Sequence, residues 1–152
     1  MNEISIRPAT IEDAAHIHNL LGELEKTLGA TSKVKRTVDD LKRFGFSGTP
    51  CFEALIAWRG AEAVGLALYF REFSSWLGTP GVYVQDLYVC PTLRGSGLGS
   101  KLMQSVYDQT RSWDAAYCKL TVHSDNEPAL AFYSQLGFQA VDDDCVLFLT
   151  LE

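Results

Sequence analysis

The residues best suited to chemistry lie in one short stretch that follows an apolar run at residues 84–89. This stretch reads Arg94-Gly95-Ser96-Gly97-Leu98-Gly99-Ser100-Lys101 and leads into a segment with helical periodicity. Glycine lets the backbone approach a ligand closely, and the first N–H groups of a helix have no acceptor within the helix. With the positive end of the helix dipole, such amides suit a phosphate or pyrophosphate. The stretch therefore predicts an anion site, and its side chains can add hydrogen bonds or charge: Arg94, Ser96, Ser100 and Lys101.

Two common phosphate motifs do not fit these glycines. A Walker A loop needs the order Gly-Lys-Ser/Thr, but here Lys101 follows Ser100 and precedes Leu102. A dinucleotide-binding pattern that begins at Gly95 needs a glycine where Ser100 stands. The pattern that does fit is R-x-x-G-x-G, at Arg94, Gly97 and Gly99. A glycine-rich helix start that binds nothing is the alternative.

Strand-like and helix-like segments alternate around this turn, which predicts a single layered α/β (α+β) domain over residues 1–152. Strands are expected at 4–7, 52–58, 64–70, 82–89, 117–122 and 146–151, with a long loop at 71–81. Helices are expected after a capping box at Thr10–Asp13, at 38–44, at 98–113, and from an Asn126 or Ser124 cap to Gly137.

Composition excludes several classes of protein. The chain has 152 residues, of which 47% are hydrophobic, and this content is typical of a folded domain. A net charge of −6 disfavours nucleic acid as a partner. No apolar stretch is long enough to span a bilayer, and residues 1–7 do not resemble an export signal. We therefore expect a cytoplasmic protein without a membrane or nucleic-acid partner.

The cysteines give no metal pattern. They stand at Cys51, Cys90, Cys118 and Cys145, without a close pair such as CxxC. The sequence therefore predicts no metal site, and it predicts buried, reduced thiols.

Several segments together resemble one known family over essentially the whole chain. They are residues 6–10 (IRPAT), residues 86–89 (DLYV), the turn at 94–99 and residues 126–138 (NEPALAFYSQLGF). On these segments the chain is similar to the GNAT superfamily of N-acetyltransferases. Within it the chain looks closest to the diamine (spermidine/spermine) branch, through residues 44–46 (FGF), 52–57 (FEALIA) and 75–78 (SWLG).

The resemblance implies a fold, a co-substrate and an assembly. The fold is a mixed, mostly antiparallel sheet flanked by helices and splayed between its fourth and fifth strands. Acetyl-coenzyme A would enter the splay, with its pyrophosphate on residues 94–101 and its pantetheine beside Leu87, Tyr88 and Val89. Asn126 would reach the pantetheine from the other side, and the chain would form a homodimer.

The resemblance also implies two catalytic roles. Backbone N–H groups near Leu87 and Val89 would donate to the oxyanion. Tyr133 would protonate the leaving thiolate, which is feasible because a phenol titrates near 10 and a thiol near 8.5. Since Tyr133 lies on the apolar face of its expected helix, a core aromatic is the alternative.

The general base stays open. The diamine branch has a glutamate where this chain has Gln85, and an amide cannot accept a proton, so Gln85 can only orient water or substrate. Asp86 points to the opposite face of a regular strand, so a structural role is its alternative. We favour deprotonation relayed by water, or binding of a neutral amine, without any protein base. Other titratable candidates are expected to be ordinary surface or packing residues: Glu53, Glu72 and His123.

The acceptor is predicted to be a small primary amine other than a polyamine. The segment after the first helix carries Lys33, Lys35 and Arg36 where polyamine enzymes of this branch are acidic. It suits an amine that also bears a carboxylate or phosphonate, or it is a solvated loop that contacts nothing. Aromatic residues can wall the acceptor site or simply belong to the core: Tyr69, Phe73, Trp76 and Tyr83. Two other readings are an acetyltransferase for protein N-termini or lysines and a non-catalytic coenzyme A sensor.

Overall fold

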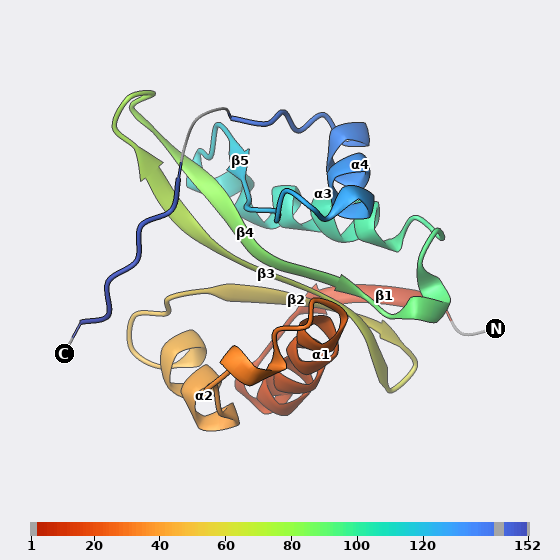
Figure 1. Cartoon of the computed structure of the whole chain (residues 1–152). Coiled ribbons are helices and arrows are strands. Elements are labelled where there is room, and N and C mark those ends of the chain that lie inside the picture. The colour runs from red at the N-terminus through yellow and green to blue at the C-terminus, as the bar shows by residue number, and fades with distance from the viewer. Residues whose placement is uncertain (1–2, 142–144, 152) are drawn as a thin grey trace. The chain divides into compact units, whose positions relative to one another are not determined.

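The computed structural model describes residues 3–141 and 145–151. These residues fall into two compact units, Met1–Thr121 and Val122–Glu152 (Figure 1). The first unit contains the glycine-rich turn, and the second contains Asn126 and Tyr133.

The first unit is built on one mixed sheet in the order β1-β2-β3-β4-β5. The strands are β1 (Ile4–Pro8), β2 (Glu53–Arg59), β3 (Glu62–Ser74), β4 (Thr79–Val89) and β5 (Cys118–Lys119). The first four pair antiparallel, whereas β4 and β5 run parallel. The predicted mixed, mostly antiparallel sheet is confirmed. The last strand is shorter than the predicted 117–122, because β5 pairs with β4 only at Val82 and Tyr83.

Helices cover both faces of this sheet (Figure 1). One face carries α1 (Ala14–Thr27) and α2 (Val38–Phe46), and the other carries α3 (Leu98–Thr110). Short 3-10 turns stand at Ile11–Asp13, Thr31–Lys33, Pro91–Leu93 and Arg111–Trp113. The predicted capping box is confirmed, since the Thr10 amide donates to the Asp13 carboxylate at 2.9 Å. A second capping box, formed by Thr37 and Asp40, starts α2.

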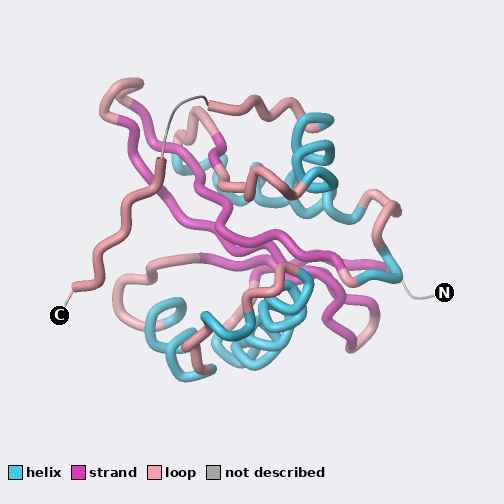
Figure 2. Tube along the Cα trace, viewed as in Figure 1, coloured by secondary structure: helices cyan, strands magenta, loops and turns pink. Residues whose placement is uncertain are grey.

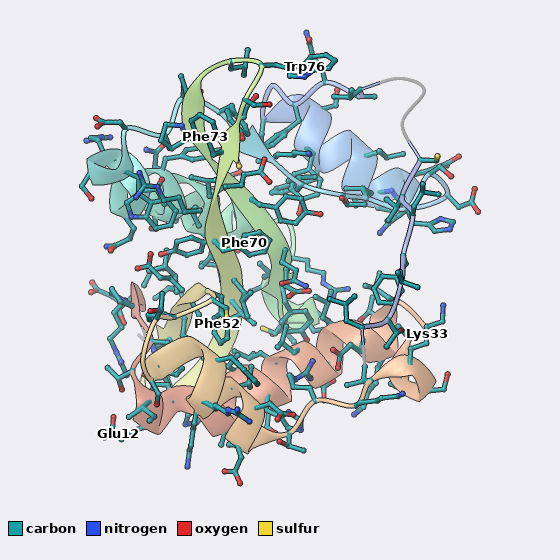
Figure 3. The ribbon with its side chains drawn as sticks, turned by 90° about the vertical axis from the view of Figure 1, so that its left-hand side faces the viewer. Glu12, Lys33, Phe52, Phe70, Phe73 and Trp76 are labelled. Carbon is teal, nitrogen blue, oxygen red and sulfur yellow. The ribbon has the colours of Figure 1, made fainter. Side chains whose placement is uncertain are left out.

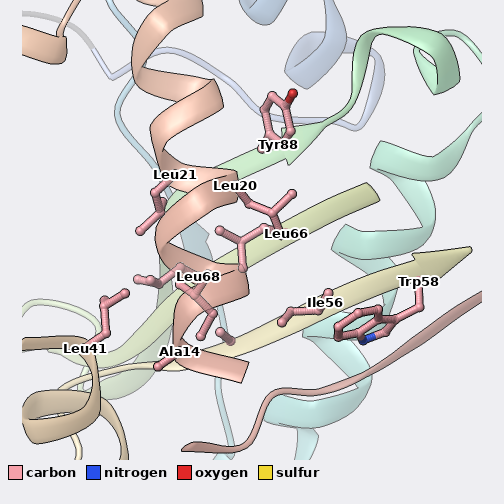
Figure 4. Packing of buried hydrophobic residues seen from close by; sticks show 11 residues of the cluster. Ala14, Leu20, Leu21, Leu41, Ile56, Trp58, Leu66, Leu68 and Tyr88 are labelled. Atoms are coloured by element: carbon pink, nitrogen blue, oxygen red, sulfur yellow. The ribbon is translucent and has the colours of Figure 1, made fainter. Parts of the chain in front are cut away.

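Several of the apolar residues that recur along the first predicted helix face the sheet and are buried. Ala14, Ile17 and Leu21 are buried from α1 against the sheet, and Figure 4 shows this helix crossing over Leu66 and Leu68. On the other face Leu102 of α3 approaches Gly65, where an added Cβ would lie 3.1 Å from a leucine methyl carbon. The two apolar layers fix β4 between helices.

The hairpin of β3 and β4 differs from its prediction. The expected loop at 71–81 is mostly strand, since β3 reaches Ser74, β4 starts at Thr79 and only 75–78 form the turn (Figure 2). Phe73 pairs with Pro80 and Arg71 with Val82, so backbone pairing continues through the proline and glycines that suggested a loop. The predicted long loop at 71–81 is therefore wrong for most of this segment.

In the second unit α4 (Glu127–Gln135) is confirmed, with Asn126 as its cap and Pro128 in its first turn. Leu136 is its C-cap, and Gly137 follows at φ 97°. The predicted strand at 146–151 is wrong. Residues 145–151 have no regular secondary structure, and no described residue pairs with them. Their apolar side chains are 82% to 90% exposed: Val146, Leu147, Phe148, Leu149 and Leu151.

The prediction of buried thiols is also wrong. All four cysteines are free; Cys51 and Cys145 are exposed, and Cys90 and Cys118 are half-buried. Cys51 and Cys145 lie outside the strands and helices, where no apolar layer covers them. Burial and the nearby Glu72 raise the pKa of Cys118 to about 11.

Candidate functional site

A β-bulge in β4 marks the centre of the candidate site. Leu68 pairs with Asp86 and Tyr69 pairs with Val84, so Gln85 is an extra residue without a cross-strand partner. The bulge lets Val84 share a face with Tyr69 while Asp86 shares the opposite face with Leu68. Regular alternation, on which the placement of Asp86 was predicted, therefore does not hold here. Bulges of this kind are frequent beside active sites, where they redirect a side chain.

Beyond the bulge, one edge of β4 is open. Parallel pairing with β5 stops at Tyr83, so, among the described residues, 84–89 pair only with β3. The Cys90 amide donates to Val64 at 2.9 Å, and the Tyr88 carbonyl faces Gly65, so these groups point toward β3. Because backbone groups alternate sides along a strand, the N–H groups of Leu87 and Val89 point to the open edge. The predicted splay between β4 and β5 is thus confirmed, and it leaves these two donors uncovered.

The glycine-rich turn directly follows this edge. Gly95 has φ 79° and Gly97 has φ 89°, a left-handed backbone that other residues rarely adopt. A Cβ added at either glycine would meet no atom within 4 Å, so the turn faces open space. Within the described chain, the amides of Gly97, Leu98, Gly99 and Ser100 donate no hydrogen bond, and the first bond of α3 runs from Lys101 to Gly97 at 3.1 Å. These amides are free to bind an anion, and the anion site stays a prediction.

Two side chains of the turn make hydrogen bonds within the chain. The Arg94 Nε donates to the Val89 carbonyl at 3.0 Å, and its guanidinium lies 5.9 Å from the Tyr88 ring centroid. The Ser96 hydroxyl donates to the Leu93 carbonyl. These bonds hold the turn against the end of β4. Within the described chain, the side chains of Ser100 and Lys101 make no hydrogen bond or ion pair.

Asp86 faces a charged cluster from α1 and the segment before α2. Arg36 makes a two-pronged ion pair with Glu25, at 2.6 and 3.0 Å, and its Nε donates to His18 Nδ1 at 3.3 Å. Burial, and secondarily the Glu25 carboxylate, raise the pKa of Asp86 to about 6, while the Arg36 guanidinium opposes the shift. The pKa of the Asp86 carboxyl group is therefore close to neutral pH. Such shifts are frequent in catalytic acids and bases.

The charged cluster near Asp86 was not predicted from the sequence. His18 and Glu25 were not singled out, and Arg36 was assigned to a basic loop or to substrate. The only signal in the sequence is the spacing of His18 and Glu25 on one helix, seven residues apart and thus on one face. Arg36 is held by two partners, whereas Lys33 and Lys35 contact no described residue through their amines.

The second unit holds the other predicted site residues. The Asn126 side-chain oxygen accepts from the Ala129 amide at 3.3 Å, so its NH₂ group is left to donate elsewhere. Tyr133 lies 5.1 Å from the Phe132 ring and 5.5 Å from the Phe138 ring, measured between centroids. Both residues are thus held by their own unit.

Trp76 is not brought together with Gln85 and Asp86. It lies in the hairpin turn, is 97% exposed, and Figure 3 shows it at the far end of the hairpin with Phe73 nearby. At about 3.3 Å per residue, the strand from Thr79 to Gln85 spans roughly 20 Å. Tyr83 stacks on Phe70 at 5.0 Å, and its hydroxyl shares a 2.6 Å hydrogen bond with Thr121.

Residues 3–141 and 145–151 contain no group of three metal-ligating side chains. In the same part of the chain no helix has the length and apolarity that crossing a bilayer requires.

Comparisons with known proteins agree with this geometry. The Acetyltransferase (GNAT) family profile matches residues 18–138. The thialysine N-epsilon-acetyltransferase of Bos taurus is 31% identical over 144 residues, covering 90% of this chain and 84% of the relative. The aminoalkylphosphonate N-acetyltransferase of Salmonella typhimurium is 27% identical over 142 residues, covering 88% and 84%.

A solved structure shares the fold. An aminoglycoside acetyltransferase from an uncultured soil metagenomic sample, in complex with sisomicin, superposes with a TM-score of 0.80 at 16% identity. The match covers 98% of this chain and 97% of that one.

Proposed function

The chain belongs to the GNAT family of acetyltransferases, and on this premise we propose that it transfers an acetyl group from acetyl-coenzyme A to the primary amine of a small molecule that also carries a carboxylate or phosphonate. The observation that carries the proposal is the open edge of β4, which leads directly into the unpaired amides of residues 97–100. Acetyl-coenzyme A supplies the reactive thioester when it is bound.

The residues of this edge fit such a co-substrate. The amides of Gly97, Leu98, Gly99 and Ser100 donate to the pyrophosphate, and Lys101 adds a positive charge. Gly95 and Gly97 keep the space in front of the amides clear. Leu87, Tyr88 and Val89 contact the pantetheine, and Asn126 donates to it through its NH₂ group.

The open edge also provides oxyanion donors. The N–H groups of Leu87 and Val89 donate to the oxygen on which negative charge develops. Donors held in place before the reaction need no reorganisation, so they can lower the barrier by several kcal/mol, about 3 for one well-placed donor.

Asp86 and Gln85 together remove the proton from the amine. An alkylammonium titrates near 10, so transfer of its proton to an ordinary aspartate is uphill by about six pKa units. With its pKa raised to about 6 by burial, Asp86 reduces that gap by about two units. Asp86 therefore accepts the proton through a water molecule that the Gln85 amide orients. Tyr133 gives its phenol proton to the leaving sulfur.

The charges near Asp86 support an acceptor of mixed charge. Arg36 is neutralised by Glu25, which leaves the lysine amines at 33 and 35 to attract an anionic group. Asp86 attracts the ammonium end. The Salmonella relative is named for an aminoalkylphosphonate, which carries both an amine and an anionic phosphonate. Its name agrees with an acceptor of mixed charge.

Three broader properties are part of the proposal. The two units act as one acetyltransferase domain, because the family match at residues 18–138 crosses their boundary at 121. Two copies associate, since the exposed apolar side chains at 146–151 need cover. The protein works in the cytoplasm, where its free thiols stay reduced.

The test is release of free coenzyme A from acetyl-coenzyme A with a matched panel of amines. We expect 2-aminoethylphosphonate and β-alanine to be turned over at a higher kcat/KM than propylamine or spermidine. Lys35→Gln reduces this preference, and Lys42→Gln on α2 serves as the control. Preference for propylamine or spermidine contradicts the acceptor class. Calorimetric binding of coenzyme A without turnover of any amine contradicts the enzymatic role and favours a sensor.

A further inference from the structure

A separate pocket of about 510 Å³ lies in the first unit, between the start of β2 and the second half of β3. Its walls come from the start of β2, the end of β3, the end of α2 and the turn after α3, and they include Phe52, Glu53, Tyr69, Arg71 and Trp113. Figure 3 shows Phe52 beside α2 and Phe70 on β3 above it. No residue from 85 to 101 lines it, so it is distinct from the proposed catalytic site.

The pocket contains two opposite charges that are not paired with each other. Glu53 and Arg71 are both exposed at the rim of the pocket, and neither makes an ion pair or hydrogen bond with any described side chain. Glu53 pairs with Tyr69 across the strands, and Arg71 stands two residues further on the same face of β3. Such diagonal neighbours are about 7–8 Å apart, so both long side chains can reach one small ligand from two sides.

The remaining walls are aromatic. Tyr69 is only 1% exposed and lies 6.1 Å from the Trp113 ring, measured between centroids. Burial, and secondarily the Glu53 carboxylate, raise the pKa of Tyr69 far above its ordinary value, so the phenol stays protonated and can donate a hydrogen bond. Partial desolvation also raises the pKa of Glu53, although the residue is exposed overall. An aromatic wall beside such a carboxylate favours an organic ammonium ion.

We propose that this pocket binds a zwitterion of the amino-acid class, with its ammonium on Glu53, its carboxylate on Arg71 and an apolar side chain against Phe52 and Trp113. A ligand with only one of these charges leaves the other pocket charge without a partner. Tyr69 donates to the ligand carboxylate from the floor of the pocket. The site is non-catalytic, and it is one strand away from the bulge, because Tyr69 pairs with Val84.

Three matched probes test the charge requirement. L-Phenylalanine carries both charges, phenethylamine lacks the carboxylate, and 3-phenylpropionate lacks the amine. Titrations of the full chain by ligand-detected NMR are expected to give saturable binding for phenylalanine. Each singly charged probe is expected to bind at least about tenfold more weakly, the usual loss for one charge-assisted hydrogen bond.

Variants locate the binding. Glu53→Gln and Arg71→Gln are each expected to raise the Kd for phenylalanine at least about tenfold, whereas Glu62→Gln on the exposed end of β3 leaves it unchanged. Thermal melting confirms that each variant is folded. If a glutamine variant unfolds, Glu53→Asp or Arg71→Lys replaces it and is expected to weaken binding less.

Several outcomes overturn the proposal. They are no saturable phenylalanine binding, equal binding of phenethylamine, or an unchanged Kd in both charge variants. Gly97→Val, which is aimed at the coenzyme A site, is expected to leave phenylalanine binding intact. A failure of the proposed acetyl transfer is thereby separated from a failure of this pocket.

Discussion

The two halves of β4 differ in how they pair with neighbouring strands. From Thr79 to Tyr83 the strand has β3 on one side, and at Val82 and Tyr83 it has β5 on the other. From Val84 to Val89 its only described partner strand is β3, and this half has a bulge at Gln85 and a half-buried carboxylate at Asp86. The first half has paired strands on both sides, whereas one edge of the second half leaves its backbone N–H and C=O groups without a described partner strand.

The difference shows how the site is made. Backbone N–H groups in folded proteins are almost always paired, so an unpaired row beside an unpaired helix start indicates a place for a ligand. The short contact at Val82 and Tyr83 fixes β5 at one end, and the splay opens from there.

The largest effect is expected from Asp86→Asn. Asparagine keeps the shape of the side chain but cannot accept a proton, so kcat/KM should fall by about 10² to 10⁴. Steady-state release of coenzyme A measures the loss, and Asp108→Asn on the exposed side of α3 is the control. In the wild type, kcat/KM should fall about tenfold per pH unit below pH 6, as Asp86 becomes protonated. An unchanged rate in the variant would remove Asp86 from catalysis and restore the mechanism without a protein base.

The next effect concerns Tyr133→Phe, which extends the comparison to the second unit. Loss of the phenol proton should lower kcat by about 10²-fold and leave the Kd for coenzyme A nearly unchanged. Single-turnover kinetics and calorimetry separate the two quantities. Tyr107→Phe on α3 is the matched control. A raised Kd with an unchanged kcat would assign Tyr133 to binding or packing.

A smaller effect is expected from Gly97→Val. Valine is strained at φ 89°, by about 1–2 kcal/mol, and its side chain projects into the space left for the pyrophosphate. The Kd for coenzyme A should rise by about tenfold or more. Gly78→Val in the hairpin turn, where φ is 69°, imposes similar strain far from the site. If both variants bind coenzyme A equally well, the turn does not hold the pyrophosphate.

The smallest effect is on stability. At pH 7.5 the wild type carries a charged Asp86 that burial disfavours, so Asp86→Asn should be more stable by about 1–3 kcal/mol. As the pH falls through 6 toward 4, the folded wild type takes up a proton before the unfolded chain does, and the gap should close. Urea unfolding at several pH values measures it. A gap that does not vary with pH would mean that Asp86 is not desolvated.

Local signals in the sequence predicted much of the fold and one half of the site. The capping box at Thr10 and Asp13, the cap at Asn126 and the bend at Gly97 depend on neighbours within a few residues, so spacing alone reveals them. The amide site follows from the same local rule.

Interactions across long sequence separations could not be predicted. The bulge at Gln85 depends on its register against Leu68 and Tyr69, and the cluster around Asp86 joins residues from α1 and the segment that follows it. The segment at 71–81 was expected to be a loop because of its proline and glycines, yet cross-strand pairing keeps it extended. Tertiary context overrides local preference at such positions.

The main-chain construction of the anion cradle has an evolutionary consequence. Ser100 and Lys101 can drift to other helix-forming residues while the N–H groups persist, because every amino acid except proline supplies one. Only the left-handed bends at 95 and 97 resist exchange. Descendants of this chain can therefore diversify the acceptor side freely and still hold the same acyl donor.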